Sequence, residues 1–245
     1  MKNKISTREL SIMGLLIGIM IVLTSTPLGF IPVGPIFATT IHIPVLIAAI
    51  LLGRKGGTIM GLVFGLLSLI RAYTNPTATS FIFMDPLVSL FPRIAMGYLT
   101  GLFYDKVKDK NPGKIKTAAF VIAGILMIYT AYNLFKRLSE GFSASVISYI
   151  IFIILTIGIM LILNNSKDKN KFSFYITAAF GTAFNTFSVL SMVYFLHAKG
   201  FMEAIGKTPD IALNTILSIA VINGLPEILV AGILVAAVVG VIKKK

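Results

Sequence analysis

Eight long apolar segments constrain the fold of this chain more than any other feature of its sequence. Seven of them approach the roughly 20 mostly apolar residues that a transmembrane helix needs, and the second is shorter. Only 13% of the 245 residues are charged, about half the usual share in a soluble domain. The sequence therefore predicts an all-α, polytopic helical bundle that forms one membrane domain over 1–245, surrounded by lipid. The segments lie at about 10–31, 41–53, 56–73, 86–104, 117–135, 145–163, 173–196 and 212–242.

The basic residues predict how this bundle is oriented. Sixteen of the 22 lysines and arginines fall at the two termini or in alternate connections, and five fall in the other connections. Cytoplasmic loops of membrane proteins are enriched in lysine and arginine. We therefore expect a multi-pass protein of the cell membrane with both termini in the cytoplasm. The connections at 26–41 and 73–85 then lie outside as shaped loops. The same clustering between apolar runs excludes a nucleic-acid-binding face, despite a net charge of +13.

Several chemistries are excluded by the residue types that the chain lacks. There is no cysteine and there are only two histidines, so we expect no metal site and no cofactor. No GxSxG, HExxH or paired-carboxylate motif occurs, and an enzyme is therefore not expected. No phosphate-binding GxxxxGK[ST] loop occurs either. Any ATP-driven work would require a partner protein.

Polar groups inside or beside the apolar segments indicate a binding site, because such groups are costly in a membrane. In the predicted topology they all lie at mid-membrane depth or further outward, which suggests one outward-facing polar pocket. A buried cation surrounded by amides and hydroxyls suits a small anion such as a carboxylate. The predicted substrate-binding residues are Thr39, His42, Thr79, Ser80, Arg93, Asn185, Asn223 and Glu227.

Each of these residues also has a purely structural interpretation. Arg93 and Glu227 are explained equally well as a buried ion pair, and the two asparagines as hydrogen-bond donors between helices. His42 is explained as an interfacial histidine without a ligand. The threonine and serine hydroxyls, like the carboxylate of Asp85 before a proline, are typical helix caps.

Small residues spaced four apart mark one face of the first segment. Such a stripe lets another helix approach closely, either a helix of a partner protein or a helix of the same chain. The third segment repeats the pattern with Gly57, Gly61 and Gly65. The first stripe, the predicted partner-docking face, consists of Ser11, Gly14 and Gly18.

Several short motifs, in this order and spacing, resemble the S components of energy-coupling factor (ECF) vitamin transporters, the substrate-binding subunits of these importers. The motifs from residue 61 onward resemble the pantothenate branch of that family in particular. The resemblance covers about 1–106 and 172–245. The motifs are STREL at 6–10, TTIHIPV at 39–45, LLGRKGG at 51–57, GLVFG at 61–65, TSF at 79–81, PR at 92–93, FNT at 184–186 and NGLPE at 223–227.

The resemblance implies a six-helix S-component core that captures a vitamin outside the cell. It also implies docking to the membrane coupling protein EcfT, driven by two ATPases, with the stripe of the first segment as the contact. The apolar pair at about 117–163 is then an additional hairpin between the fourth and fifth core helices. Carboxylate chemistry favours pantothenate, while riboflavin, a pyrimidine precursor, folate and an autonomous secondary transporter remain alternatives.

Overall fold

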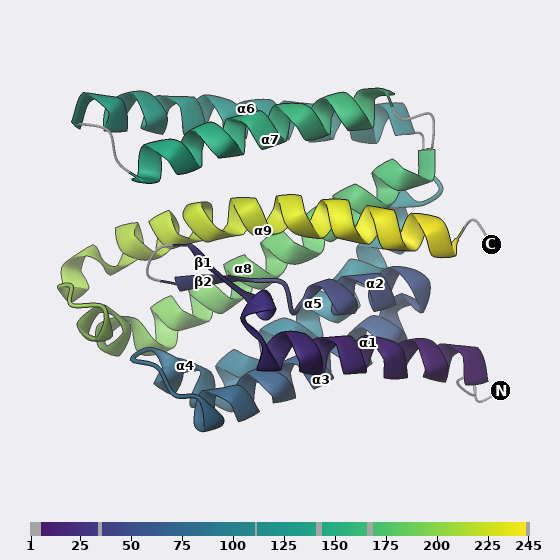
Figure 1. The fold of residues 1–245 in the computed structure, drawn as a ribbon, viewed down its shortest axis with the longest axis horizontal. Helices are drawn as coiled ribbons and strands as arrows, with labels where there is room; N and C mark the ends of the chain where they lie inside the picture. The colour runs from purple at the N-terminus through teal and green to yellow at the C-terminus, as the bar shows by residue number, and fades with distance from the viewer. Residues whose placement is uncertain (1–5, 34–35, 111, 141–143, 166–168, 244–245) are drawn as a thin grey trace.

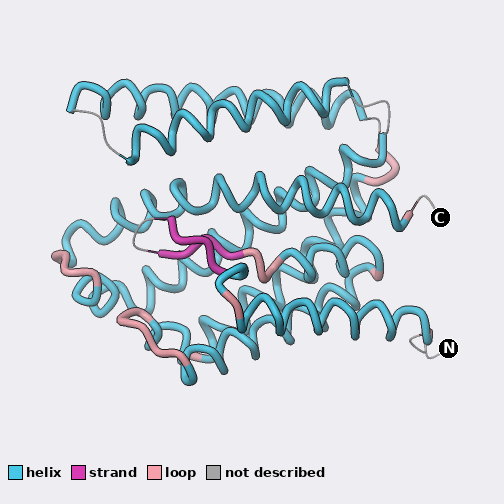
Figure 2. The backbone as a smooth tube through the Cα atoms, in the orientation of Figure 1, coloured by secondary structure: helices cyan, strands magenta, loops and turns pink. Residues whose placement is uncertain are grey.

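The computed structural model describes residues 6–33, 36–110, 112–140, 144–165 and 169–243, and within them helices dominate (Figures 1 and 2). One pair of short strands and two short 3₁₀ helices, at Pro27–Gly29 and Pro209–Ile211, complete the described elements. The elements are α1 (Thr7–Ser25), β1 (Phe30–Val33), β2 (Ile36–Thr39), α2 (Ile43–Leu51), α3 (Gly53–Thr74), α4 (Ser80–Met84), α5 (Pro86–Val107), α6 (Pro112–Glu140), α7 (Ala144–Asn165), α8 (Lys169–Ala204) and α9 (Ala212–Ile242).

Five helices in the described part of the chain are long and apolar enough to cross a membrane, namely α1, α3, α5, α8 and α9. The chain is thus a multi-pass helical membrane protein. Helix α2 has nine residues, or about 14 Å at 1.5 Å per residue, and is too short to cross alone. It ends where the sequence predicted a break, because Gly53 has a φ of +71° and turns the chain directly into α3.

Glycines hold α3 and α5 in close contact. The faces of Gly57, Gly61 and Gly65 lie against the backbone of α5 at Gly97, Arg93 and Ser89, respectively. A side chain at any of these three glycines would meet that backbone, so the helices approach as closely as the small-residue pattern predicted. This contact sets the position of Arg93.

The connection after α1, which the sequence predicted as a shaped loop, contains a pair of short strands. Helix α1 ends at Ser25 rather than near residue 31, and an antiparallel strand pair follows, with Phe30 opposite Thr39. The all-α fold class holds, because helices dominate the described residues, and this short strand pair is a local exception to it. The apolar residues of 30–38 were counted toward a membrane span and a loop, whereas the backbone pairs locally as a hairpin that lies beside α9.

Helices α6 and α7 pair with each other and form a separate layer beside α9 (Figure 1). Among the remaining helices, α6 contacts α8 and α7 contacts α9. The beginning of α1 and the end of α9 lie at the same end of the molecule, where Ser6 and Lys243 border one cleft. The strand pair and α4 lie toward the opposite end.

Candidate ligand-binding cavity

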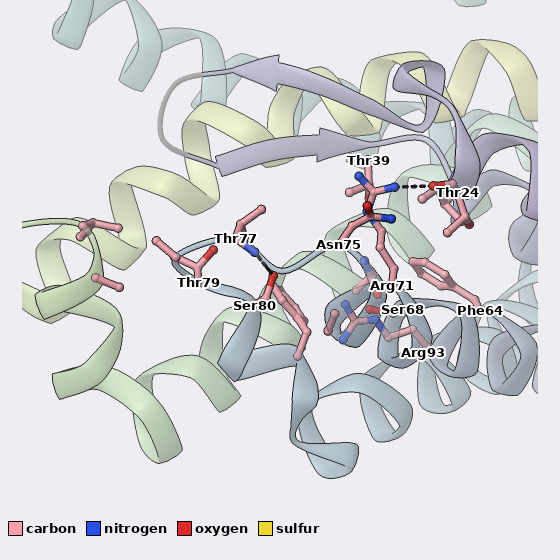
Figure 3. Close-up of a pocket in the computed structure, with 17 residues that line it drawn as sticks. Thr24, Thr39, Phe64, Ser68, Arg71, Asn75, Thr77, Thr79, Ser80 and Arg93 are labelled. Carbon is pink, nitrogen blue, oxygen red and sulfur yellow. Dashed lines mark hydrogen bonds between the residues drawn. The ribbon is translucent and has the colours of Figure 1, made fainter.

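Two adjoining chambers lie between α3, α4, α5, α8, α9 and the strand pair. The large chamber has a volume of about 330 Å³ and the small chamber about 110 Å³. The large one falls at the lower end of the range of about 300–1,000 Å³ that is typical of small-molecule sites. The two chambers share five lining residues, so together they form one cavity. Figure 3 shows the residues that line the large chamber. The shared lining residues are Thr39, Thr79, Phe83, Arg93 and Asn185.

The structure brings seven of the eight predicted substrate-binding residues to this cavity. Ser80 lines only the large chamber, Asn223 and Glu227 line only the small one, and the other four lie on the boundary. His42 lies elsewhere: it is fully buried, and its Nε2 is 2.9 Å from Oγ1 of Thr182 on α8. Histidine at this position therefore joins α2 to α8 and does not line either chamber.

Arg93 is held in place by the proline that precedes it. Pro92 has no N–H, so the carbonyl of Val88, four residues before it, lacks its usual helical donor. Nη1 of Arg93 donates to that carbonyl at 2.5 Å. The guanidinium carbon also lies 5.5 Å from the ring centre of Phe64 and 5.4 Å from that of Phe83, within the range of cation–π attraction.

The Arg93 side chain has hydrogen-bonding capacity that the described residues do not use. It is only 5% exposed, and its Nε has no hydrogen-bond partner among the described residues. The side-chain oxygen of Asn185 is buried on the same boundary and likewise has none. Buried polar atoms without partners are rare in proteins. A donor and an acceptor in this state on one cavity wall suit a polar ligand.

Glu227 joins three elements at the small chamber. Its Oε1 accepts the backbone N–H of Thr39 at 2.5 Å, and its Oε2 accepts the hydroxyl of Thr186 at 3.0 Å. The carboxylate thereby links α9 to the end of β2 and to α8. The buried Arg93–Glu227 ion pair considered from the sequence is not formed between these two described residues, because each is held by other partners.

Two polar residues of α3 and the residue that caps its C-terminus line the large chamber and were missed by the sequence analysis. Ser68, Arg71 and Asn75 are spaced three and four apart, so they share one face of the helix. Arg71 was counted only as a flanking charge for topology. Its Nη1 donates to the backbone carbonyl of Thr24 at the end of α1 (Figure 3). Polar residues spaced three and four apart within an apolar segment are the sequence signal that could have identified this face.

Some of the residues predicted as helix caps act as caps and others do not. Asp85 caps α5 as expected, since its Oδ1 accepts the N–H of Leu87 at 2.9 Å. Its Oδ2 lies 3.0 Å from Nε2 of His197, at the kink of α8. This hydrogen bond lowers the pKa of Asp85. Thr79 precedes α4 but its side chain caps nothing, whereas the hydroxyl of Ser80 accepts the N–H of Thr77 at 2.8 Å.

The small-residue stripe of α1 faces away from the protein. Ser11, Gly14 and Gly18 are exposed, and a side-chain carbon added at either glycine would meet no atom within 4 Å. The interpretation that this stripe packs against another helix of the same chain is therefore wrong for the part of the chain that the structure describes. The glycines of α3, in contrast, do pack against another helix of the same chain.

A family model described as "ECF transporter, substrate-specific component" matches residues 8–139, which is more than half of the chain. The chain belongs to this family of ECF transporter components. Membership in the ECF family gives the protein a role in transport rather than in catalysis. It also agrees with the multi-pass membrane architecture.

Two relatives of this ECF component are known by name. The pantothenate transporter PanT of Leuconostoc mesenteroides is 38% identical over 92 residues, which cover 35% of this chain and 45% of that protein. This match thus spans less than half of the relative's length. The pantothenic acid transporter PanT of Lactococcus lactis is 26% identical over 195 residues, covering 69% of this chain and 100% of that protein.

Proposed function

We propose that the protein is the substrate-binding S component of an ECF importer and that it captures pantothenate from outside the cell. The observation that carries this proposal is the buried Arg93 on the boundary of two chambers, with an Nε that has no partner among the described residues. Pantothenate has a carboxylate, an amide and two hydroxyl groups. A guanidinium binds a carboxylate through charge-assisted hydrogen bonds, which are stronger than neutral ones.

The remaining polar groups suit the rest of this ligand. Glu227 and Asn185 present oxygens that accept hydrogen bonds from hydroxyl or amide groups. Thr39 and Thr79 add hydroxyls at the boundary, and Phe64 and Phe83 supply apolar wall. Two named relatives that transport pantothenate support the choice of this vitamin over riboflavin, a pyrimidine precursor or folate.

The proposed architecture is a six-helix core, consisting of α1, α2, α3, α5, α8 and α9, with α6 and α7 as an additional hairpin. Both termini are cytoplasmic. The cavity then opens toward the outside, since the strand pair and α4 lie at the end opposite the two termini. In this arrangement the ligand enters from outside without crossing the bilayer.

The proposed partners are an EcfT-like coupling protein and two ATPases, because an isolated S component has no source of energy. The exposed stripe of Ser11, Gly14 and Gly18 is the proposed contact with EcfT. A helix can approach closely over such a surface since no side chains keep it apart.

Binding and uptake test the proposal separately. The purified protein is expected to bind pantothenate in a calorimetric titration and to bind riboflavin, folate and uracil at least 100-fold more weakly. Cells that produce the protein together with an EcfT and two ATPases are expected to take up labelled pantothenate, and cells that produce it alone are not. Tight binding of another vitamin would refute the substrate, and uptake by the protein alone would favour a secondary transporter.

A further inference from the structure

Most of the residues that line only the small chamber are apolar. Five of these apolar side chains are buried in one hydrophobic cluster, and the sixth, Leu190, packs against that cluster. A wall of this kind favours a compact apolar group over a charged one, because burying a charge away from water is costly. The six residues are Ile82, Val189, Leu190, Val193, Phe201 and Ile219.

Glu227 is the acidic residue among the described residues of the cavity lining, and it lines only the small chamber. Both of its carboxylate oxygens accept hydrogen bonds, from Thr39 and Thr186, as those of an ionised carboxylate do. An ionised carboxylate has about four acceptor sites, so Glu227 can still accept a hydrogen bond from a ligand hydroxyl. The same negative charge repels a ligand carboxylate from this chamber.

The volume of the small chamber limits the size of the group that it can hold. This volume is about 110 Å³. An engineered apolar cavity of about 150 Å³ holds one benzene molecule. The branched end of pantothenate, HOCH₂–C(CH₃)₂–CH(OH)–, has about as many non-hydrogen atoms as benzene. It combines two methyl groups, which suit the apolar wall, with hydroxyl groups that can donate to Glu227.

We propose that the small chamber is the subsite for the branched, hydroxyl-bearing end of the ligand, and that the ligand carboxylate binds Arg93 from the large chamber. This inference rests on the proposed pantothenate function and adds the direction in which the ligand lies. The amide between the two ends then lies at the boundary of the chambers. There the buried side-chain oxygen of Asn185 has no partner among the described residues, and an amide N–H supplies the donor that it lacks.

Glycoloyl-β-alanine is a truncated probe for the subsite. It keeps the carboxylate, the amide and the neighbouring hydroxyl of pantothenate but lacks the C(CH₃)₂CH₂OH group. In calorimetric titrations the wild-type protein is expected to bind this probe at least 100-fold more weakly than pantothenate. Val193→Phe adds bulk to the small chamber, so it is expected to weaken pantothenate binding at least 30-fold. The affinity for the truncated probe is expected to change less than threefold.

Two further variants complete this experiment. Val241→Phe is the matched control, because it makes the same exchange at an exposed valine of α9 that lines neither chamber. Both affinities are expected to stay unchanged in it. Val193→Ala removes apolar contact without adding bulk, so it decides the question even where Val193→Phe does not fold. It is expected to lower pantothenate affinity three- to tenfold and to leave the affinity for the truncated probe within twofold.

Glu227→Gln tests the direction of the ligand. Panthenol replaces the carboxylate of pantothenate with a CH₂OH group and keeps the branched end. In the proposed direction Glu227 contacts hydroxyl groups that both ligands have, so the two affinities are expected to fall by the same factor to within threefold. In the reverse direction Glu227 would lie beside the ligand carboxylate. Removing its negative charge would then strengthen pantothenate binding relative to panthenol binding.

The outcomes separate this inference from the proposed function. Equal affinities of the wild-type protein for pantothenate and the truncated probe would overturn the inference. So would equal losses for these two ligands in a folded Val193 variant, or a gain of pantothenate over panthenol in Glu227→Gln. In each of these cases pantothenate still binds, so the proposed function stands. A wild-type protein that binds none of the three ligands would refute the proposed function itself, and the inference with it.

Discussion

The contact between α3 and α5 leads to a quantitative prediction about Gly61. An alanine Cβ at this position would lie 2.9 Å from the carbonyl carbon of Arg93 and 3.1 Å from the Cα of Ile94. Ordinary contacts of a Cβ with other heavy atoms are 3.4–4 Å. The atoms in the way belong to the backbone, so they cannot rotate aside. The two helices must therefore separate by at least about 0.5 Å in Gly61→Ala.

Overpacking of this kind costs about 1–3 kcal/mol of stability. Alanine also stabilises a helix relative to glycine by about 1 kcal/mol, which would mask part of the effect. Gly14→Ala is the matched control, since it makes the same exchange within a helix and meets no atom within 4 Å. We expect the apparent melting temperature in detergent to be lower in Gly61→Ala than in Gly14→Ala by about 2–12 °C.

The same displacement moves Arg93, because the crowded atoms belong to its own backbone. Pantothenate affinity in Gly61→Ala is expected to fall about tenfold, or about 1.4 kcal/mol, with Gly14→Ala close to wild type. Equal melting temperatures and equal affinities in the two variants would refute the close approach of α3 and α5. They would also refute its role in positioning the guanidinium.

Three further predictions concern the stripe, the hairpin and the carboxylate. Gly14→Leu or Gly18→Leu is expected to leave pantothenate binding intact and to abolish ATP-dependent uptake; loss of binding as well would contradict a docking role. Joining Lys116 directly to Lys167 removes the hairpin, from which none of the described lining residues comes, and affinity is expected to stay within about tenfold. A correctly inserted deletion variant that cannot bind would show that the hairpin shapes the site. Glu227→Gln is expected to weaken binding about tenfold in calorimetry, because a charged acceptor is lost; unchanged affinity would exclude Glu227 from ligand contact.

Much of the helical framework could be predicted from hydropathy alone. The five helices that meet the length and hydropathy criteria for a span coincide with predicted segments, and α2 is the short, broken segment that the sequence indicated. The family match covers the other predicted pair of segments, helices α6 and α7, only up to residue 139 within α6. The hairpin deletion tests directly whether this pair is needed for ligand binding. Costly polar residues in apolar runs also led to seven of the thirteen polar residues that line the cavity, including Arg93 and Asn185.

The missed features depend on partners that are distant in the sequence. The strand pair was missed because local pairing of 30–33 with 36–39 competes with the helical interpretation of the same apolar residues. The contact of His42 with Thr182 and that of Glu227 with Thr39 each join residues more than 100 positions apart. Arg71 was misjudged because an arginine near the end of a span can be a flanking charge that sets topology or can line a cavity, and Arg71 lines the large chamber.

The central claim is that pantothenate binds in the cavity at Arg93, and one titration tests it most directly. Pantothenate is titrated into wild-type protein and Arg93→Ala, both shown by melting temperature and gel filtration to be folded. The account predicts at least 100-fold weaker binding in Arg93→Ala, about 2.7 kcal/mol, and partial recovery in Arg93→Lys, because lysine keeps the charge but loses the fork of donors. Wild-type affinity in a folded Arg93→Ala protein would contradict the claim.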